Sequence, residues 1–85
     1  MYMAEVVGNV VSTKKEDSLT GKKLMVIQRI NTELERIGDQ EVAVDAVGSG
    51  IGEYVIIASG SPVRHIFSPV ACIDKAIVGI IDSIE

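Results

Sequence analysis

The sequence contains no tryptophan, and its only aromatic residues are Tyr2, Tyr54 and Phe67. Aromatic platforms on which bases or sugars stack are therefore scarce, which argues against a protein that binds single-stranded nucleic acid. Basic residues are also a minority, with 8 Lys and Arg against 12 Asp and Glu and a formal net charge of −4. Because neutralising phosphates requires a cationic face, this charge balance predicts no nucleic-acid partner.

Cysteine and histidine occur once each, as Cys72 and His65. A single thiol cannot form an internal disulfide, which is compatible with a reducing cytosol. Polar residues interrupt every apolar run far short of the ~18 residues that a membrane span needs. Residues 1–5 lack the basic and apolar regions of a signal peptide. We therefore expect no membrane partner and a soluble, cytoplasmic protein.

β-branched residues are abundant: 12 Ile and 12 Val stand among 85 residues, against only three Leu. Ile and Val are stiff at χ1 and favour strands, whereas Leu is the usual residue of helical faces. An apolar fraction of 47% excludes intrinsic disorder, and a chain of this length holds one core. The sequence therefore predicts one mainly β domain over residues 1–85.

Five extended runs separated by turn-rich segments are predicted to be strands. They span residues 4–13, 23–31, 41–47, 53–59 and 76–84. The polar segment between the first two predicted strands is expected to form a long exposed hairpin loop. Residues 32–35 have the spacing of a capping box, followed by Gly38 as a helix stop, so a short helical turn and a plain loop are equally expected there.

One short helix is predicted before the last strand. Ser61 suits the N-cap and Pro62 the first helical position, so a turn of helix is expected over residues 63–67. The Ser68-Pro69 pair is expected to end it. Five short strands with one small helix predict a small five-stranded OB-like β-barrel.

The strands have an unusual distribution of apolar residues. A monomeric barrel with a solvated exterior should alternate apolar and polar residues, but the second, fourth and fifth strands carry Val, Ile or Met on both faces. Either the helix and long loops cover the exterior or another subunit does. Because extended apolar patches usually mark interfaces, we favour oligomerisation. At least one of Val78 and Ile80 is then expected to be buried, so that glutamate there impairs folding or assembly.

No group of residues predicts catalysis, a metal or a cofactor. His65 and Cys72 lack any surrounding nucleophile signature, and adding Asp74 supplies neither the number nor the spacing of metal ligands. We expect His65 to be an incidental surface residue and Cys72 a small buried thiol. A solvated face is the expectation for the carboxylates of Glu33, Glu35, Asp39 and Glu41.

The glycine-rich segment 48–52 superficially resembles a phosphate-binding turn. Its spacing excludes that interpretation, because the dinucleotide pattern needs glycine where Glu53 stands and no Gly-Lys-Ser/Thr follows. Glycines between two strands instead permit positive φ angles and the close backbone approach of a narrow opening or a tight subunit contact. The one basic cluster comprises Lys14, Lys15, Lys22 and Lys23. We expect this loop either to dock on an acidic neighbour or simply to keep the hairpin soluble.

Four motifs follow one another along essentially all 85 residues: 8–15 with 18–24, 42–53, 59–64 and 73–82. Jointly they resemble those of the bacterial microcompartment vertex proteins, the CcmL/EutN family. The chain departs from the family where Ala46, Ser49, Pro62 and Val63 stand. The Gly52-Glu53 pair and the absence of a C-terminal extension look more like the metabolosome branch than the carboxysome branch.

The resemblance implies a five-stranded barrel that assembles into a homopentamer and caps the fivefold vertices of a polyhedral shell. A flat layer of hexameric shell proteins cannot close, and a fivefold unit at each corner supplies the missing curvature. The implied partners are therefore copies of this chain and hexameric shell proteins, inside the cytoplasm, and no catalysis is implied. The alternative, from a different class, is a monomeric OB-like module that binds a ligand or nucleic acid.

Two segments are the candidate assembly or axis-facing elements. Glycine permits close approach between subunits, and the guanidinium of Arg64 suits a bidentate pair across an interface. The candidate residues are Gly48, Ser49, Gly50, Gly52, Gly60, Ser61 and Arg64.

Overall fold

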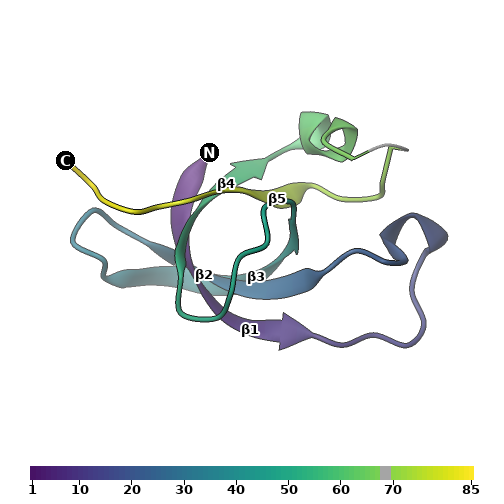
Figure 1. Cartoon of the computed structure of the whole chain (residues 1–85), viewed down its shortest axis with the longest axis horizontal. Coiled ribbons are helices and arrows are strands. Elements are labelled where there is room, and N and C mark those ends of the chain that lie inside the picture. The colour runs from purple at the N-terminus through teal and green to yellow at the C-terminus, as the bar shows by residue number, and fades with distance from the viewer. Residues whose placement is uncertain (68–69) are drawn as a thin grey trace.

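The computed structural model describes residues 1–67 and 70–85, which form a closed barrel (Figure 1). The strand order is β1-β2-β3-β5-β4, with β3 and β5 parallel and the other neighbours antiparallel. This confirms the predicted five-stranded OB-like barrel. The strands are β1 (Tyr2–Val10), β2 (Leu24–Ile30), β3 (Arg36–Asp45), β4 (Tyr54–Ser59) and β5 (Lys75–Ile80).

The barrel interior is filled by alanine, valine and isoleucine side chains together with that of Met25. Register shifts between Val6 and Gly8, between Gln28 and Ile30, and between Ile56 and Ile57 interrupt the ladders. Such bulges increase the local twist, which lets five short strands close on themselves. The core comprises Ala4, Val6, Met25, Ile27, Ala43, Val55, Ile57 and Ile77.

The β2–β3 connection is a tight turn, so the plain-loop expectation is right and the helical one is wrong. The Asn31 side-chain oxygen accepts hydrogen bonds from the backbone N–H groups of Glu33 and Glu35, which holds the turn closed. Strand β3 begins at Arg36, five residues earlier than predicted. Gly38 has a φ of 72°, and the buried Gln28 amide donates to its carbonyl at 3.1 Å. This segment, residues 36–40, thus pairs with β2 although it is mostly polar.

The predicted short helix is present in a different form. It is a 3-10 helix, η2 (Ser61–His65), and a second one, η1 (Asp17–Leu19), lies in the loop between β1 and β2. The N-cap of η2 is Gly60 and Ser61 is the first helical residue, so the helix begins one position earlier than predicted. The expected helix stop at Ser68-Pro69 lies outside the described residues. Strand β5 ends at Ile80 rather than Ile84, because the chain leaves the sheet after a last bond from the Ile81 N–H to the Tyr54 carbonyl.

Apolar side chains remain exposed both on the barrel's strands and on the segments that connect them. The expectation that Val78 or Ile80 is buried is wrong for the single chain: Val78 is half-buried and Ile80 is 36% exposed, whereas the buried residues of β5 are Ala76 and Ile77. Helix η2 covers only part of the exterior, through Val63. Eleven large apolar residues among those described remain exposed: Met1, Val11, Leu34, Ile37, Val42, Val47, Ile51, Ile66, Val70, Ile80 and Ile84.

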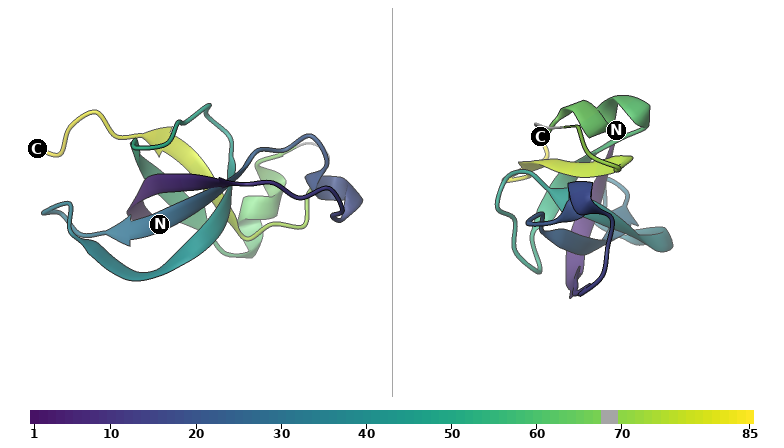
Figure 2. Two further views of the ribbon diagram at one scale, coloured as in Figure 1. Left: turned by 90° about the horizontal axis from the view of Figure 1, so that it is seen from below. Right: turned by 90° about the vertical axis from the view of Figure 1, so that its right-hand side faces the viewer.

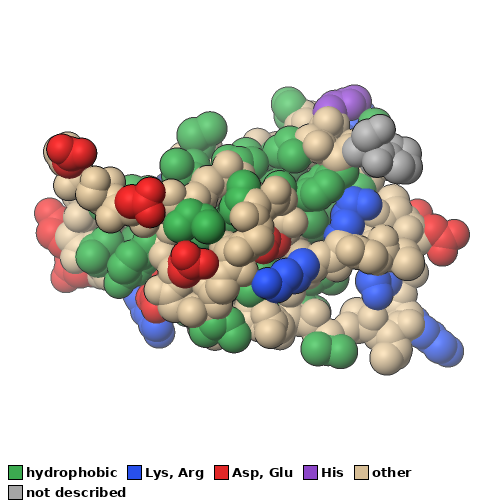
Figure 3. Space-filling view, in the orientation of Figure 1, with side chains coloured by type: hydrophobic (Ala, Val, Ile, Leu, Met, Phe, Trp, Pro, Cys, Tyr) green, Lys and Arg blue, Asp and Glu red, His purple; other side chains and the backbone are tan. Residues whose placement is uncertain are grey.

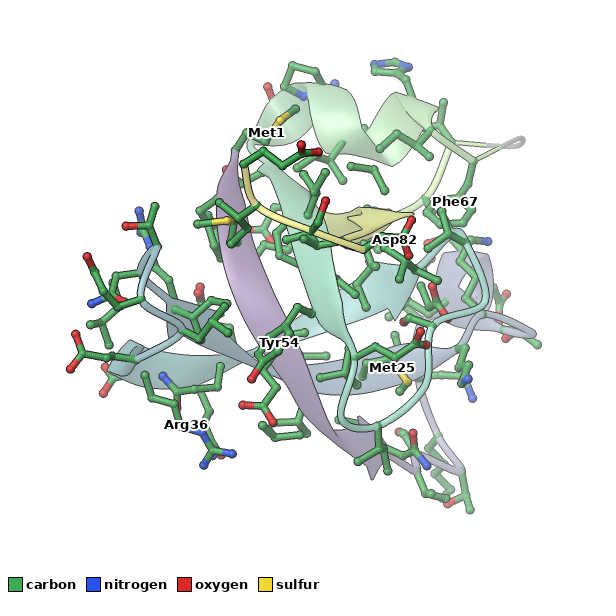
Figure 4. All side chains as sticks on the ribbon, turned by 60° about the vertical axis from the view of Figure 1, so that its left-hand side comes forward. Met1, Met25, Arg36, Tyr54, Phe67 and Asp82 are labelled. Atoms are coloured by element: carbon green, nitrogen blue, oxygen red, sulfur yellow. The ribbon has the colours of Figure 1, made fainter. Side chains whose placement is uncertain are left out.

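The molecule is elongated, with extents of 38 × 24 × 21 Å. At one end of the long axis lie the β2–β3 turn and the C-terminal segment, and at the other lies the loop that carries η1 (Figures 1 and 2). Arg36, near the β2–β3 turn, and Phe67, close to that loop, lie at opposite ends of the barrel in Figure 4. Within residues 1–67 and 70–85, no helix has the length and apolar character needed to cross a membrane.

Candidate assembly site

The glycine-rich loop between β3 and β4 is organised by one carboxylate that the sequence did not single out. The Asp45 side chain, which is 1% exposed, accepts backbone N–H bonds from Val47 at 3.0 Å, Gly48 at 3.1 Å and Ser49 at 2.8 Å. The ammonium of Lys23 lies 4.0 Å from it and donates to the Ser49 carbonyl at 2.9 Å. The loop is therefore a built turn whose donors are satisfied from within the subunit.

Positive φ angles explain two of the glycines in this loop. Gly48 and Gly52 have φ values of 78° and 94°, a region that side chains with a Cβ rarely adopt. The Gly52 N–H donates to the Val6 carbonyl at 2.8 Å, which ties the loop to β1. Gly50 differs: its φ is ordinary, and its N–H donates to the Glu53 carboxylate at 2.6 Å. The predicted need for backbone freedom thus applies to Gly48 and Gly52.

Ser49 is enclosed by its own subunit. It is 1% exposed, and its hydroxyl is the buried side-chain polar atom that has no hydrogen-bond partner within the described part of the chain. Its side chain therefore does not face outward in the single subunit. The surface of the loop is formed instead by the exposed apolar side chains of Val47 and Ile51.

The second candidate segment, residues 60–64, begins with another positive-φ glycine. Gly60 has a φ of 98°, and its N–H donates to the Asp74 carbonyl at 2.9 Å. Ser61 and Arg64 are exposed and line a surface hollow together with Glu16 and Cys72. The Arg64 guanidinium forms no ion pair with the residues that are described, while its backbone carbonyl accepts from Ala71 at 3.2 Å. An unpaired, exposed guanidinium remains available to a neighbour.

The structure does not bring the two candidate segments together. One precedes β4 (Tyr54–Ser59) and the other follows it, so they lie at its opposite ends (Figure 1). At about 3.3 Å per residue, a strand of this length keeps them roughly 20 Å apart. They are therefore two separate surfaces of one subunit.

Sequence reasoning missed a polar network that links strands β1, β2, β3 and β5. The Tyr2 hydroxyl donates to the Glu41 carboxylate at 2.8 Å, and the Lys75 ammonium lies 3.2 Å from the same group. The Arg29 guanidinium stacks over the Tyr2 ring at 4.5 Å. Glu41 is therefore not part of a solvated face, although Glu33, Glu35 and Asp39 are exposed as expected. These four residues lie far apart in the sequence, so no local sequence motif reveals the network.

The network shifts the ionisation of its members. Burial alone raises the pKa of Glu41, but the hydrogen bonds from Tyr2 and Lys75 outweigh it and hold that pKa below its ordinary value. The hydrogen bond to Glu41 raises the pKa of Lys75. Burial, then the bond to Glu41, raises the pKa of the Tyr2 hydroxyl. A lowered carboxyl pKa stabilises the fold above the unfolded-state pKa, and that stabilisation is lost as the pH falls through the folded-state pKa.

Replacing Glu41 with Gln is expected to lower the melting temperature at pH 7 by about 2–4 °C, since a partly exposed pair contributes about 0.5 kcal/mol. The deficit should shrink as the pH falls below about 4.3, the ordinary pKa of a glutamate, and disappear once the pH has passed through the lowered pKa of Glu41 in the folded protein. Thermal unfolding followed from pH 3 to pH 8 measures this. Asp39→Asn, an exposed position on the same strand, is the control. A deficit that stays constant down to pH 3 would contradict the role of charge.

The remaining sequence candidates lie on the surface. His65 is exposed, as expected, but Cys72 is exposed too, so the expectation of a buried thiol is wrong. Cys72 lines the same surface hollow as Arg64, and its N–H donates to the Ser18 hydroxyl at 2.8 Å. No metal-binding cluster of His, Cys, Asp or Glu occurs among the residues described. Of the four clustered lysines, Lys23 belongs to the Asp45 turn, and Lys22 lies 5.3 Å from the Phe67 ring.

The closed strand order and the apolar outer face define a small OB-like barrel subunit. The chain belongs to the family described as ethanolamine utilisation protein EutN/carboxysome, whose model matches residues 1–82. This confirms the resemblance drawn from the sequence motifs.

Relatives and solved structures of this family match over the whole chain. The chain is 49% identical to the bacterial microcompartment shell vertex protein PduN of Salmonella typhimurium, covering 100% of the chain and 99% of the relative. It is 46% identical to the carboxysome shell vertex protein CcmL of Thermosynechococcus vestitus, over 100% and 87%. The GrpN pentameric microcompartment shell protein from Rhodospirillum rubrum superposes with a TM-score of 0.92 at 46% identity, over 100% and 99% of the two chains.

Proposed function

We propose that this chain is a structural shell protein that forms homopentamers and caps the fivefold vertices of a bacterial microcompartment. The observation that carries the proposal is the end-to-end match, at a TM-score of 0.92, to a protein described as a pentameric microcompartment shell protein. The relatives called shell vertex proteins, among them PduN and CcmL, match over the whole chain as well.

The exposed apolar side chains support the same proposal on physical grounds. A closed barrel has no free sheet edge, so neighbours must be joined by side chains and turns. In a cyclic ring one surface of each subunit meets a different surface of the next, which requires apolar residues on two sides of the barrel. Val42 on β3 and Ile80 on β5 are exposed on the barrel wall, and Ile51 is exposed on the glycine-rich loop. Burying them between copies removes apolar area from water.

The proposal includes the partners and location of the assembly. Hexameric shell proteins are the neighbours that a fivefold unit completes, and the cytoplasm is where such a shell is located. The role is geometric rather than enzymatic. The net charge of −4 and the scarcity of aromatic residues give no reason to add a nucleic-acid partner.

Native mass spectrometry of the purified protein tests the proposal directly. Five copies of a 9.1 kDa chain are expected at about 45 kDa. A mass near 9.1 kDa at every concentration would instead indicate the alternative, a monomeric OB-like binding module.

Arg64→Ala is expected to weaken the pentamer if Arg64 pairs with a neighbouring subunit. Loss of a charge-assisted pair typically removes about 1.5–3 kcal/mol, so the concentration at which pentamers dissociate should rise about tenfold or more. Arg36→Ala is the matched control, because Arg36 already pairs with Glu5 of its own chain at 3.3 Å. An unchanged pentamer of unchanged stability would remove Arg64 from the interface.

A further inference from the structure

The contact between β3 and β5 is the shortest of the five strand pairings in the barrel. It contains two registered residue pairs, Val44 with Ala76 and Asp45 with Ile77, and it is parallel. The other four pairings are antiparallel and contain four to six registered pairs each. Because parallel pairing is also slightly less stable per residue, this contact, which we call the β3–β5 seam, is the weakest closure of the barrel.

The two strands diverge on one side of the seam. A cleft of about 150 Å³, which we call the seam cleft, lies between residues 42–44 of β3 and residues 72–75. The β3 residues along the cleft pair with β2, whereas pairing with β5 begins only at Val44. Backbone pairing therefore joins the two strands only beyond the cleft, where the Ala46 N–H also donates to the Ile77 carbonyl at 3.1 Å.

A side-chain ion pair joins the two strands beside the seam cleft. The Lys75 ammonium lies 3.2 Å from the Glu41 carboxylate, and among the described residues this is the one ion pair between β3 and β5. The Tyr2 hydroxyl of β1 donates to the same carboxylate at 2.8 Å. Arg29 of β2 stacks on the Tyr2 ring, and the Asp74 carboxylate lies 3.7 Å from Lys75. Side chains from β1, β2 and β5 thus converge on Glu41 next to the shortest contact of the barrel.

Opening the β3–β5 seam would leave the other four pairings in place. The strands would then form an open sheet in the order β3-β2-β1-β4-β5, in which all neighbours are antiparallel. The glycine-rich loop after β3 would stay attached to β1, because the Gly52 N–H donates to the Val6 carbonyl at 2.8 Å. Local openings occur where the fewest contacts hold an element. The burial of Ala76 and Ile77 and the ion pair beside them oppose this one.

We propose that the barrel opens along the β3–β5 seam, and that the Glu41–Lys75 ion pair keeps the seam closed at neutral pH and releases it in acid. The opening is a property of the single subunit, so it does not depend on the proposed function. It converts the closed barrel into an open sheet without unfolding the chain.

The direction of the pH effect follows from the ionisation of Glu41. Burial raises its pKa, but the hydrogen bonds from Tyr2 and Lys75 outweigh burial and keep that pKa below its ordinary value. In the open sheet the carboxylate no longer faces Lys75, so its pKa returns towards the ordinary value of about 4.3. Ionisation therefore favours the closed seam above about pH 4.3, and this advantage is lost as the pH falls through the lowered pKa. The pKa values of Lys75 and Tyr2 are raised, so both keep their protons in this range.

Amide hydrogen exchange of the intact chain, resolved by residue with NMR, tests the opening of the seam. The Ala46 N–H bonds across the seam, whereas the N–H of the preceding Asp45 donates at 2.9 Å to the carbonyl of Lys23, next to β2. After correction for intrinsic exchange rates, we expect Ala46 to be at least tenfold less protected than Asp45. Dilute denaturant should hardly change exchange at Ala46, because opening the seam exposes little surface. Equal protection and equal denaturant dependence of the two amides would overturn the opening.

The same measurement between pH 3 and pH 7 tests the ion pair. At pH 7, Glu41→Gln should lower the protection of Ala46 about two- to threefold, as expected for a partly exposed pair. The difference should vanish as the pH passes through the lowered pKa of Glu41. Lys75→Met should have an effect of similar size, and the double variant should lose little more, because the two side chains form one interaction.

Exposed carboxylates titrate in the same pH range and require a control. Figure 3 shows acidic side chains gathered mainly toward the end that carries the C-terminus. Asp39→Asn removes an exposed carboxylate from β3 itself and should leave both the protection of Ala46 and its pH dependence unchanged. The ion pair's role is overturned if acid affects Ala46 equally in the parent and in Glu41→Gln, or if the effects of the two single variants add. A parent protein that is monomeric at every concentration would refute the proposed function alone, since exchange at the seam is measured in either oligomeric state.

Discussion

The Asp45→Asn variant is expected to melt about 4–24 °C below the parent protein. The carboxylate accepts three backbone N–H bonds in a nearly water-free position, and an amide retains one acceptor oxygen. Its NH₂ group would then face the N–H of Ser49 and the ammonium of Lys23, both of which are donors. Leaving a buried donor without an acceptor costs about 1–3 kcal/mol, and each kcal/mol lowers the melting temperature of a domain this size by about 4–8 °C.

Thermal unfolding by circular dichroism measures this effect, at one fixed protein concentration because assembly makes melting concentration-dependent. Asp39→Asn is the matched control: it lies on the same strand, is exposed, and forms no hydrogen bond or ion pair with the described residues. Its free energy of unfolding should stay within about 0.5 kcal/mol of the parent's. Equal melting temperatures for the two variants would refute the role of Asp45 in building the loop.

The Ile77→Glu variant is expected not to fold. Ile77 is completely buried at the centre of the barrel, where its neighbours are apolar side chains. Burying an unpaired carboxylate there costs several kcal/mol, which is comparable with the roughly 4–13 kcal/mol of total stability expected for a chain this long. The measurement is the loss of strand signal in circular dichroism and of dispersion in the amide proton spectrum.

Two variants on the same strand sharpen this test. Ile77→Val removes one methylene and should cost about 1 kcal/mol while preserving the fold. Ile80→Glu should fold, because Ile80 is on the outer face where a carboxylate reaches water, and its effect should instead be a weaker assembly. A folded Ile77→Glu protein with the parent's melting temperature would show that the core has been assigned to the wrong face of β5.

The strand-rich architecture was accessible from composition, since Ile and Val dominate and turn residues separate five runs. The start of β3 was not, because residues 36–40 are mostly polar and include Gly38. Those residues form a strand because β2 offers them a ladder, with Gln28 opposite Gln40 and Ile30 opposite Arg36. Pairing with a neighbour supplies the hydrogen bonds that local propensity does not indicate.

For the candidate site, too, the sequence predicted some features and missed others. The glycines of segment 48–52 were predicted to permit positive φ angles, which is confirmed for Gly48 and Gly52 but not for Gly50. Asp45, by contrast, looked like the polar member of an alternating strand. Its importance arises because the chain turns back so that three N–H groups converge on its carboxylate, a geometry that residue spacing does not specify.

From the residues alone follow the β-barrel class, the family and the excess of apolar positions over what one barrel interior can hold, because these depend on residue type and order. The folded chain decided where those residues lie. It separated the two candidate turns to opposite ends of β4, buried Ser49, exposed Cys72, and joined Tyr2, Glu41 and Lys75 across the barrel. Contacts of this kind link residues dozens of positions apart, so they exist only once the sheet has closed.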